Sequence, residues 1–139
     1  MNNIYNNYLF NYKRRKSIPV SIGDSVIGGD NPIRIQSMTT SDTMNTNATV
    51  EEAIRMINSG SEYIRITAPS INEAKNLQNI KKELKKRGFN VPLIADIHFT
   101  PNAAEIAAQI VEKVRINPGN FADKKSFKNI EYDDDSYNT

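Results

Sequence analysis

Charged and polar side chains stand where three successive apolar segments of the sequence end, and these residues are the ones that could do chemistry. The five candidates are Arg65, Asp96, His98, Arg115 and Asn117. A guanidinium group offers phosphate oxygens paired donors in a fixed planar geometry, and a carboxamide adds a further donor. The set therefore predicts a site for an anionic, phosphorylated ligand. In such a site the carboxylate of Asp96 would balance the arginine charges or accept a hydrogen bond from a ligand hydroxyl.

Simpler explanations exist for some of these residues. Arg65 and Asp96 could form a structural ion pair between neighbouring strands. His98 is the only histidine of the chain, and by default it would be a hydrogen-bonded wall residue, because one histidine cannot hold zinc without further ligands. The pair Gly28-Gly29 matches neither phosphate-loop pattern and is better explained by turn geometry. We therefore predict no metal site in this chain.

Alternating strands and helices must position the five candidates. Strands are expected at residues 33–37, 63–67, 91–97 and 114–117, with helices between them. Side chains alternate along a strand, so Asp96 and His98 share one face. Strands that alternate with helices form a parallel sheet, and ligands bind at the carboxyl ends of its strands. The spacing therefore predicts that the five residues converge on one pocket.

Capping residues mark where the helices begin. Thr49 followed by Glu52 has the pattern of a capping box at the start of the first helix. Ser70 followed by Glu73 repeats this pattern for the second helix. Pro101 stands at the first turn of the third helix, predicted at residues 101–110, where proline is tolerated.

The whole pattern predicts one α/β domain flanked by two tails. We divide the chain into an arm at residues 1–17, an α/β region at 18–120 that opens with a β-hairpin, and an acidic tail or truncated next element at 121–139. About four βα units are half of an eight-stranded barrel, which usually takes about 250 residues. A four-stranded doubly wound sheet also fits this count.

Composition excludes several classes of function. The 18 Lys and Arg residues nearly balance 16 Asp and Glu residues, so the net charge of +2 does not favour nucleic acid or an anionic membrane as a partner. The chain has no cysteine, which excludes a disulfide framework, a cysteine nucleophile and thiolate ligands from this chain. No stretch approaches the roughly 20 apolar residues that cross a bilayer, and no signal peptide is evident. We therefore expect a cytoplasmic protein.

Several motifs occur in a fixed order along the chain. They are Val20-Ser21-Ile22-Gly23, Ile27-Gly28-Gly29, Pro32-Ile33-Arg34-Ile35-Gln36-Ser37-Met38-Thr39, Ile64-Arg65-Ile66-Thr67, Ala95-Asp96-Ile97-His98-Phe99 and Val114-Arg115-Ile116-Asn117-Pro118-Gly119-Asn120. In order and spacing, from about Tyr12 to Lys125, the chain resembles the family of 4-hydroxy-3-methylbut-2-enyl diphosphate synthases. Its Asn- and Tyr-rich start and its Asn-Phe-Ala-Asp-Lys segment are similar to the longer, three-domain type. The combination is specific, whereas a single motif would not be.

The resemblance implies the amino-terminal part of a TIM (β/α)8 barrel that binds 2-C-methyl-D-erythritol 2,4-cyclodiphosphate in non-mevalonate isoprenoid biosynthesis. It also implies an iron–sulfur oxidoreductase, a homodimer when complete, whose [4Fe–4S] cluster is held by three cysteines and a glutamate of a carboxyl-terminal domain. Ferredoxin or flavodoxin would supply two electrons, which open the cyclic diphosphate and expel the C3 hydroxyl as water. This chain itself would ligate no cluster.

The resemblance also implies roles for the five candidates. Arg65, Arg115 and Asn117 would bind the diphosphate, while Asp96 and His98 would line the substrate end of the pocket. The spatial reasoning from the strands selects the same residues. The family's catalytic lysine and glutamate region has no counterpart here, so the catalytic residues are expected in the missing carboxyl-terminal part.

Three positions depart from the family pattern. Asn45 stands where aspartate is usual, Ser61 where cysteine often follows glycine, and Pro69-Ser70 where the longer type tends to Gln-Gly. The larger departure is that the sequence stops about halfway round the barrel, so we expect a fragment of a longer product or an inactive truncated remnant. Two alternatives stay open, namely a dihydropteroate-synthase-like or other phosphate-binding barrel, and a noncatalytic binding module.

Overall fold

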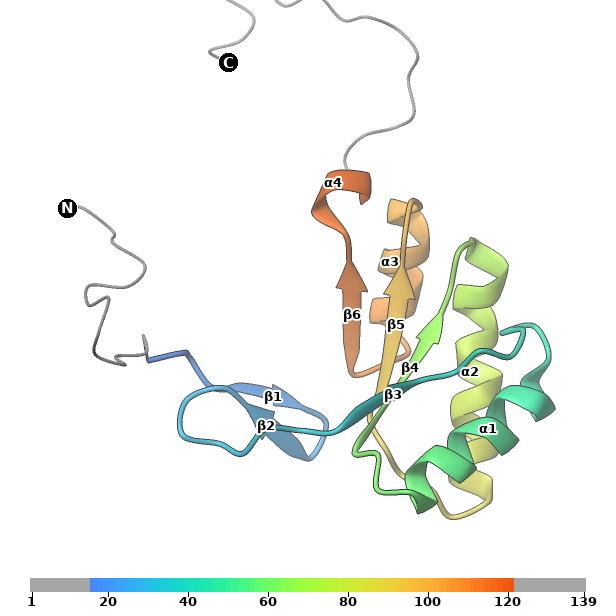
Figure 1. Ribbon diagram of the computed structural model, residues 1–139. Helices are drawn as coiled ribbons and strands as arrows, with labels where there is room; N and C mark the ends of the chain where they lie inside the picture. The colour runs from blue at the N-terminus through green and yellow to red at the C-terminus, as the bar shows by residue number, and fades with distance from the viewer. Residues whose placement is uncertain (1–15, 122–139) are drawn as a thin grey trace, which may run out of the picture.

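A parallel sheet of four strands forms the centre of the computed structural model, which describes residues 16–121 (Figure 1). The strands are β3 (Gln36–Met38), β4 (Tyr63–Thr67), β5 (Leu93–Ile97) and β6 (Lys113–Ile116), in that spatial order. The helices are α1 (Thr46–Asn58), α2 (Ile71–Lys86), α3 (Pro101–Ala108) and the short α4 (Pro118–Phe121). Each strand pairs with its successor after a helical crossover. This is the order of the amino-terminal half of a (β/α)8 barrel, as the sequence predicts.

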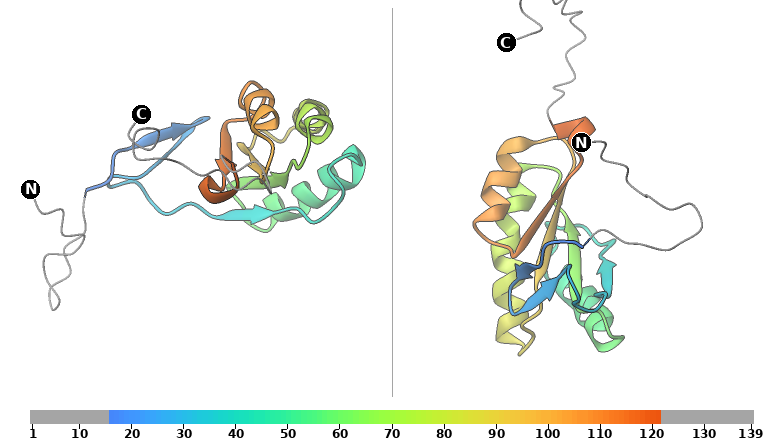
Figure 2. Two further views of the ribbon diagram at one scale, coloured as in Figure 1. Left: turned by 90° about the horizontal axis from the view of Figure 1, so that it is seen from above. Right: turned by 90° about the vertical axis from the view of Figure 1, so that its left-hand side faces the viewer.

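Helices α1, α2 and α3 cover one side of the sheet, and the main hydrophobic core lies between them and the strands (Figure 2). Ile64 and Ile66 point from β4 into this core, and both are fully buried. Leu77 and Ile80 meet them from α2 and are equally buried. Their spacing of three follows the helical period, so one apolar face of α2 packs against the sheet.

A small antiparallel hairpin, β1 (Val20–Ile22) and β2 (Ser25–Ile27), lies on the other side of the sheet (Figure 2). Gly23 in its turn has a φ of +56°, a backbone conformation that residues with a side chain rarely adopt. Ile22 packs against Tyr63 and Ile94, which face away from the helices. The hairpin therefore covers the amino-terminal part of this face and leaves the carboxyl-terminal part uncovered.

The first strand of the sheet begins later than the predicted range of 33–37. Ile33 and Ile35 are 92% and 59% exposed and lie outside the strand. The backbone amide of Ile35 donates to the Glu62 carboxylate at 2.8 Å. The side chain of Glu62 thus takes a hydrogen bond that a strand would otherwise provide, which the apolar pattern does not reveal.

The start of the first helix also differs from the prediction. Asn45, rather than Thr49, is the N-cap of α1, and its Oδ1 accepts from the amide of Ala48 at 3.1 Å. Thr49 is buried within the helix. In contrast, the predicted cap of α2 is confirmed, since Ser70 Oγ accepts from the Asn72 amide at 3.2 Å.

The remaining boundaries lie close to the predicted ones, except that Pro118 opens the short helix α4 instead of simply ending a strand. The predicted arm at residues 1–17 and tail at 121–139 fall outside the described residues apart from positions 16, 17 and 121. Within residues 16–121, no helix has the length and apolar character needed to cross a membrane.

Candidate anion-binding site

Asp96 is the centre of a cluster of charged side chains near the carboxyl ends of β4, β5 and β6. Its side chain is 2% exposed. Arg65 Nη2 donates to Asp96 Oδ2 at 2.6 Å, and Arg115 Nη1 donates to Oδ1 at 3.1 Å. His98 Nε2 lies 3.2 Å from Oδ2. One buried carboxylate thus joins three basic side chains from neighbouring strands and the loop that follows β5.

The register of the parallel sheet explains why these residues meet. Asp96 is paired with Thr67 on β4 and with Arg115 on β6. Arg65 lies two residues before Thr67 and therefore points to the same face of the sheet. This face is opposite the helices and beyond the part that the hairpin covers. The strand alternation that sends Ile64 and Ile66 into the core consequently sends Arg65 to the open face.

The cations keep Asp96 ionised. Burial raises the pKa of Asp96, but hydrogen bonds from Arg65 and His98 and the charges of Arg65 and Arg115 outweigh burial, so the pKa is lowered from its ordinary value. Two guanidinium charges face this single carboxylate. The two guanidinium groups therefore leave an excess of one positive charge over the carboxylate, and this charge attracts an anion.

Several donors of the cluster remain available to a ligand. Arg65 Nε is buried and has no hydrogen-bond partner among the described residues. The side chains of Arg115 and His98 are 39% and 41% exposed. A buried unpaired donor is costly, and an anion placed on the open face could satisfy it. The arrangement can therefore bind an oxyanion through charge-assisted hydrogen bonds.

Asn117 is the predicted site residue that the structure does not join to this cluster. It follows β6, and its Oδ1 accepts from the amide of Gly119 at 3.3 Å. Within residues 16–121, no hydrogen bond links it to Asp96 or to either arginine of the cluster. The structure thus brings together Arg65, Asp96, His98 and Arg115 and places Asn117 in the adjacent turn.

The sequence did not reveal the hydrogen bonds that hold the end of β3 and the loop between β3 and α1 beside this cluster. From the sequence, Gln36-Ser37-Met38-Thr39-Thr40 at the end of the first strand is expected to offer hydroxyl and amide donors to the rim of the site. In the structure these donors are used within the protein: Ser37 Oγ on β3 pairs with Ser61 Oγ at 2.6 Å, and the hydroxyl and amide of Thr40 donate to Glu52 Oε1 at 2.9 and 3.1 Å. Composition predicts a loop here, but it does not reveal these partners.

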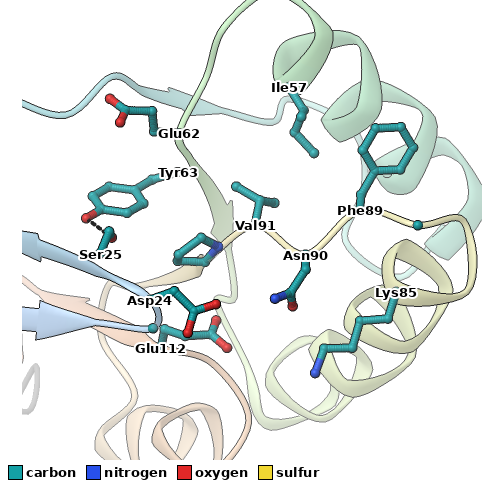
Figure 3. A pocket seen from close by; sticks show the side chains of 13 residues that line it. Asp24, Ser25, Ile57, Glu62, Tyr63, Lys85, Phe89, Asn90, Val91 and Glu112 are labelled. Atoms are coloured by element: carbon teal, nitrogen blue, oxygen red, sulfur yellow. Dashed lines mark hydrogen bonds between the residues drawn. The ribbon is translucent and has the colours of Figure 1, made fainter.

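A second hollow lies at the opposite, amino-terminal end of the sheet (Figure 3). It has a volume of about 600 Å³ and lies between the hairpin turn and the loop that precedes β5. Two of its carboxylates are used structurally, because Glu112 pairs with Lys81 at 2.7 Å and Glu62 pairs with Arg34 at 2.7 Å. The described residues hold no group of three or more His, Asp or Glu side chains suited to a metal ion. The Asp96 cluster is therefore the stronger candidate site.

Comparisons with known proteins agree with this architecture. The chain is 57% identical over 129 residues to the 4-hydroxy-3-methylbut-2-en-1-yl diphosphate synthase (flavodoxin) of Parabacteroides distasonis. The aligned region covers 92% of this chain and 21% of that protein. It is 53% identical over 138 residues to the synthase of the same name from Leptospira interrogans, covering 99% of this chain and 21% of that protein. The chain thus spans about a fifth of the length of these curated relatives. Residues 17–135 match the GcpE TIM-barrel domain, and the chain belongs to this family.

Proposed function

We propose that this chain is the substrate-binding part of a 4-hydroxy-3-methylbut-2-en-1-yl diphosphate synthase, and that it binds 2-C-methyl-D-erythritol 2,4-cyclodiphosphate. The observation that carries the proposal is the cluster of Arg65, Asp96 and Arg115 on the open face of a half-barrel. Relatives that are more than half identical to this chain are synthases of this diphosphate, which supports the choice of substrate class.

In this proposal the cluster binds the diphosphate by charge and by directed donors. Asp96 holds the two guanidinium groups, while Arg65 Nε and the exposed part of Arg115 donate to phosphate oxygens. Hydrogen bonds of this charged kind contribute roughly 1.5–3 kcal/mol each. His98 contacts Asp96 through Nε2, and its ring lines the same pocket. Asn117, two residues after Arg115 along the chain, is proposed as a further ligand of the diphosphate, although its Oδ1 here accepts from the amide of Gly119.

This chain does not fit the iron–sulfur cluster that the proposed reaction requires. A [4Fe–4S] cluster is held mainly by cysteine thiolates, and the sequence contains no cysteine. We therefore assign substrate binding to this chain and no electron-transfer step. In the relatives most of the length lies outside the region matched here. We propose a cytoplasmic, homodimeric enzyme. Its electrons would come from flavodoxin, which the names of the relatives include, or from ferredoxin, and would be delivered to that other part.

Binding measurements on the 139-residue chain test the proposal. Isothermal titration with the cyclodiphosphate and with inorganic pyrophosphate should show binding by the wild type. Arg115→Leu should weaken it about 10- to 100-fold, because one charge-assisted contact is lost. Arg55→Leu is the matched control, since Arg55 is exposed on α1, away from the cluster, and its affinity should equal that of the wild type.

Two results would contradict this function. An Arg115→Leu variant that folds, as judged by its circular dichroism spectrum, and binds both ligands as well as the wild type would remove Arg115 from the site. Failure of the wild-type chain to bind either ligand would remove the substrate-binding role itself.

A further inference from the structure

The loop between β3 and α1, residues 39–45, is fixed on one side by a carboxylate of the following helix. Glu52 Oε1 accepts from Thr40 Oγ1 at 2.9 Å, and the backbone amide of Thr40 lies 3.1 Å from both Glu52 oxygens. The amide and hydroxyl of Ser41 donate to Oε2 at 2.9 and 2.7 Å. Four donors of two consecutive residues thus converge on one side chain.

The same loop is fixed on its other side by buried polar groups. Thr43 and Asn76 are 5% and 9% exposed. Thr43 donates its hydroxyl hydrogen to the carbonyl of Thr67 at 2.6 Å, and Asn76 Nδ2 donates to the carbonyl of Thr43 at 2.7 Å. The loop is therefore held between α1 on one side and β4 with α2 on the other.

These attachments lead directly to the strand that carries Arg65. The amide of Thr39, the first residue of the loop, donates to the carbonyl of Arg65 at 3.0 Å. The carbonyl that Thr43 contacts belongs to Thr67, which is the register partner of Asp96. The backbone of β4 is thus bonded to the loop at the carbonyl of Arg65 and again two residues later.

Glu52 has no other evident task. The N-cap of α1 is Asn45, and within residues 16–121 Glu52 forms no ion pair. Burial raises the pKa of Glu52, but the hydrogen bonds from Ser41 and Thr40 outweigh burial and lower the pKa to about 2. The carboxylate is therefore charged at neutral pH and accepts from all four donors.

We propose that Glu52 is a positioning residue for the anion-binding site, acting through the loop on the backbone of Arg65 and Thr67. The inference rests on the function proposed above. Surface loops are usually mobile, and ordering a mobile loop when a ligand binds costs conformational entropy. A loop that is already ordered avoids this cost, so the ligand binds more tightly. Because the amides of Thr40 and Ser41 face Glu52, the loop acts by fixing Arg65 and not by donating to the ligand.

Two adjacent glutamates allow a matched test. Glu52→Gln places an amide NH2 group among donors that need an acceptor, whereas Glu51→Gln alters only a contact with Arg87 at the surface. The probe is inorganic pyrophosphate, titrated into the complete chain at pH 7. We expect Glu52→Gln to weaken binding by about fivefold or more, because the loop must then be ordered on binding. Glu51→Gln should stay within about twofold of the wild type.

Hydrogen exchange separates positioning from a purely structural role. Glu52→Gln should speed the exchange of the Thr40 and Ser41 amides, and the affinity should fall with it. If Glu52→Gln leaves the affinity for pyrophosphate unchanged, the inference is overturned, whether or not the Thr40 and Ser41 amides exchange faster. If Glu52→Gln does not fold, Thr43→Val carries the same test, since it removes the hydroxyl that contacts Thr67 and keeps the side chain's size.

The proposed function and this inference fail in different ways. Absence of pyrophosphate binding by the wild type overturns the function and the inference that rests on it. Wild-type binding that Arg115→Leu weakens and Glu52→Gln leaves unchanged overturns the inference alone.

Discussion

Asp96→Asn is the substitution that most directly tests the physics of the site. Asparagine has nearly the same shape as aspartate, so the change removes the charge and leaves the packing. Two guanidinium groups, 2.6 and 3.1 Å from the carboxylate oxygens, would then lack a counter-charge. The variant therefore measures how much stability this carboxylate provides.

The expected cost follows from the burial of the three side chains. Breaking a fully buried ion pair costs about 3–5 kcal/mol, while an exposed pair contributes about 0–1 kcal/mol. Asp96 is 2% exposed, but Arg65 and Arg115 are 25% and 39% exposed and can be partly solvated in the variant. We expect the free energy of unfolding to fall by about 2 kcal/mol, and the melting temperature to fall by roughly 10 °C.

Urea unfolding followed by far-ultraviolet circular dichroism at pH 7 measures the loss. Asp24→Asn, in the exposed hairpin turn, is the matched control and should change the free energy of unfolding by less than about 0.5 kcal/mol. If Asp96→Asn costs no more than this control, the carboxylate does not hold the arginines as argued.

The difference in free energy of unfolding between the wild type and Asp96→Asn should also depend on pH. The pKa of Asp96 is lower in the folded protein than its ordinary value of 3.8. Its contribution is therefore fully present above the pKa of the unfolded chain and is lost as pH falls through the folded value. The difference between the wild type and Asp96→Asn should be largest near neutral pH and shrink below about pH 4. A difference that grows on acidification would show that the ionised carboxylate of Asp96 does not provide this stability.

Two further predictions concern the core and the hairpin. Leu77→Ala should lower the free energy of unfolding by about 3 kcal/mol in urea titrations, because Leu77 is fully buried between α2 and the sheet; the exposed Lys82→Ala on the same helix should cost less than about 0.5 kcal/mol. Tyr63→Phe should cost about 1 kcal/mol, because Ser25 already gives its hydroxyl hydrogen to the carbonyl of Ile22 and Tyr63 must then donate to Ser25 at 2.6 Å. A double-mutant cycle with Ser25→Ala that finds no coupling would show that this bond does not fasten the hairpin.

The parts of the fold that depend on local chemistry were predictable. Ser70 caps α2 as its sequence pattern indicates, because the capping contacts join residues that are neighbours along the chain. The strand at Tyr63–Thr67 has the predicted bounds, since its alternation reflects burial on one face. The first strand was misplaced where a distant glutamate, Glu62, takes the amide of Ile35. The start of the first helix was misplaced because Asn45 caps it, while Glu52 accepts from Thr40 and Ser41 in the preceding loop and does not complete a capping box with Thr49.

The candidate site divides in the same way. The sequence places Arg65, Asp96 and Arg115 near strand ends, and parallel pairing brings such ends to one edge. It does not distinguish Asn117, whose oxygen accepts from the amide of Gly119 two residues later. A position near a strand end does not tell by itself whether a side chain faces the site or bonds to its own turn, as that of Asn117 does.

The sequence by itself determined the alternation of strands and helices, the hairpin turn and the family to which the motifs are similar. The reason is that these features follow from periodicity and from contacts within a few residues of each other. Only the tertiary structure decided that Asp96 is buried beneath two arginines and that Glu52 fastens the loop beside them. These contacts join residues between 11 and 31 positions apart. They depend on the register of the sheet and on helix packing, which the residue pattern does not specify.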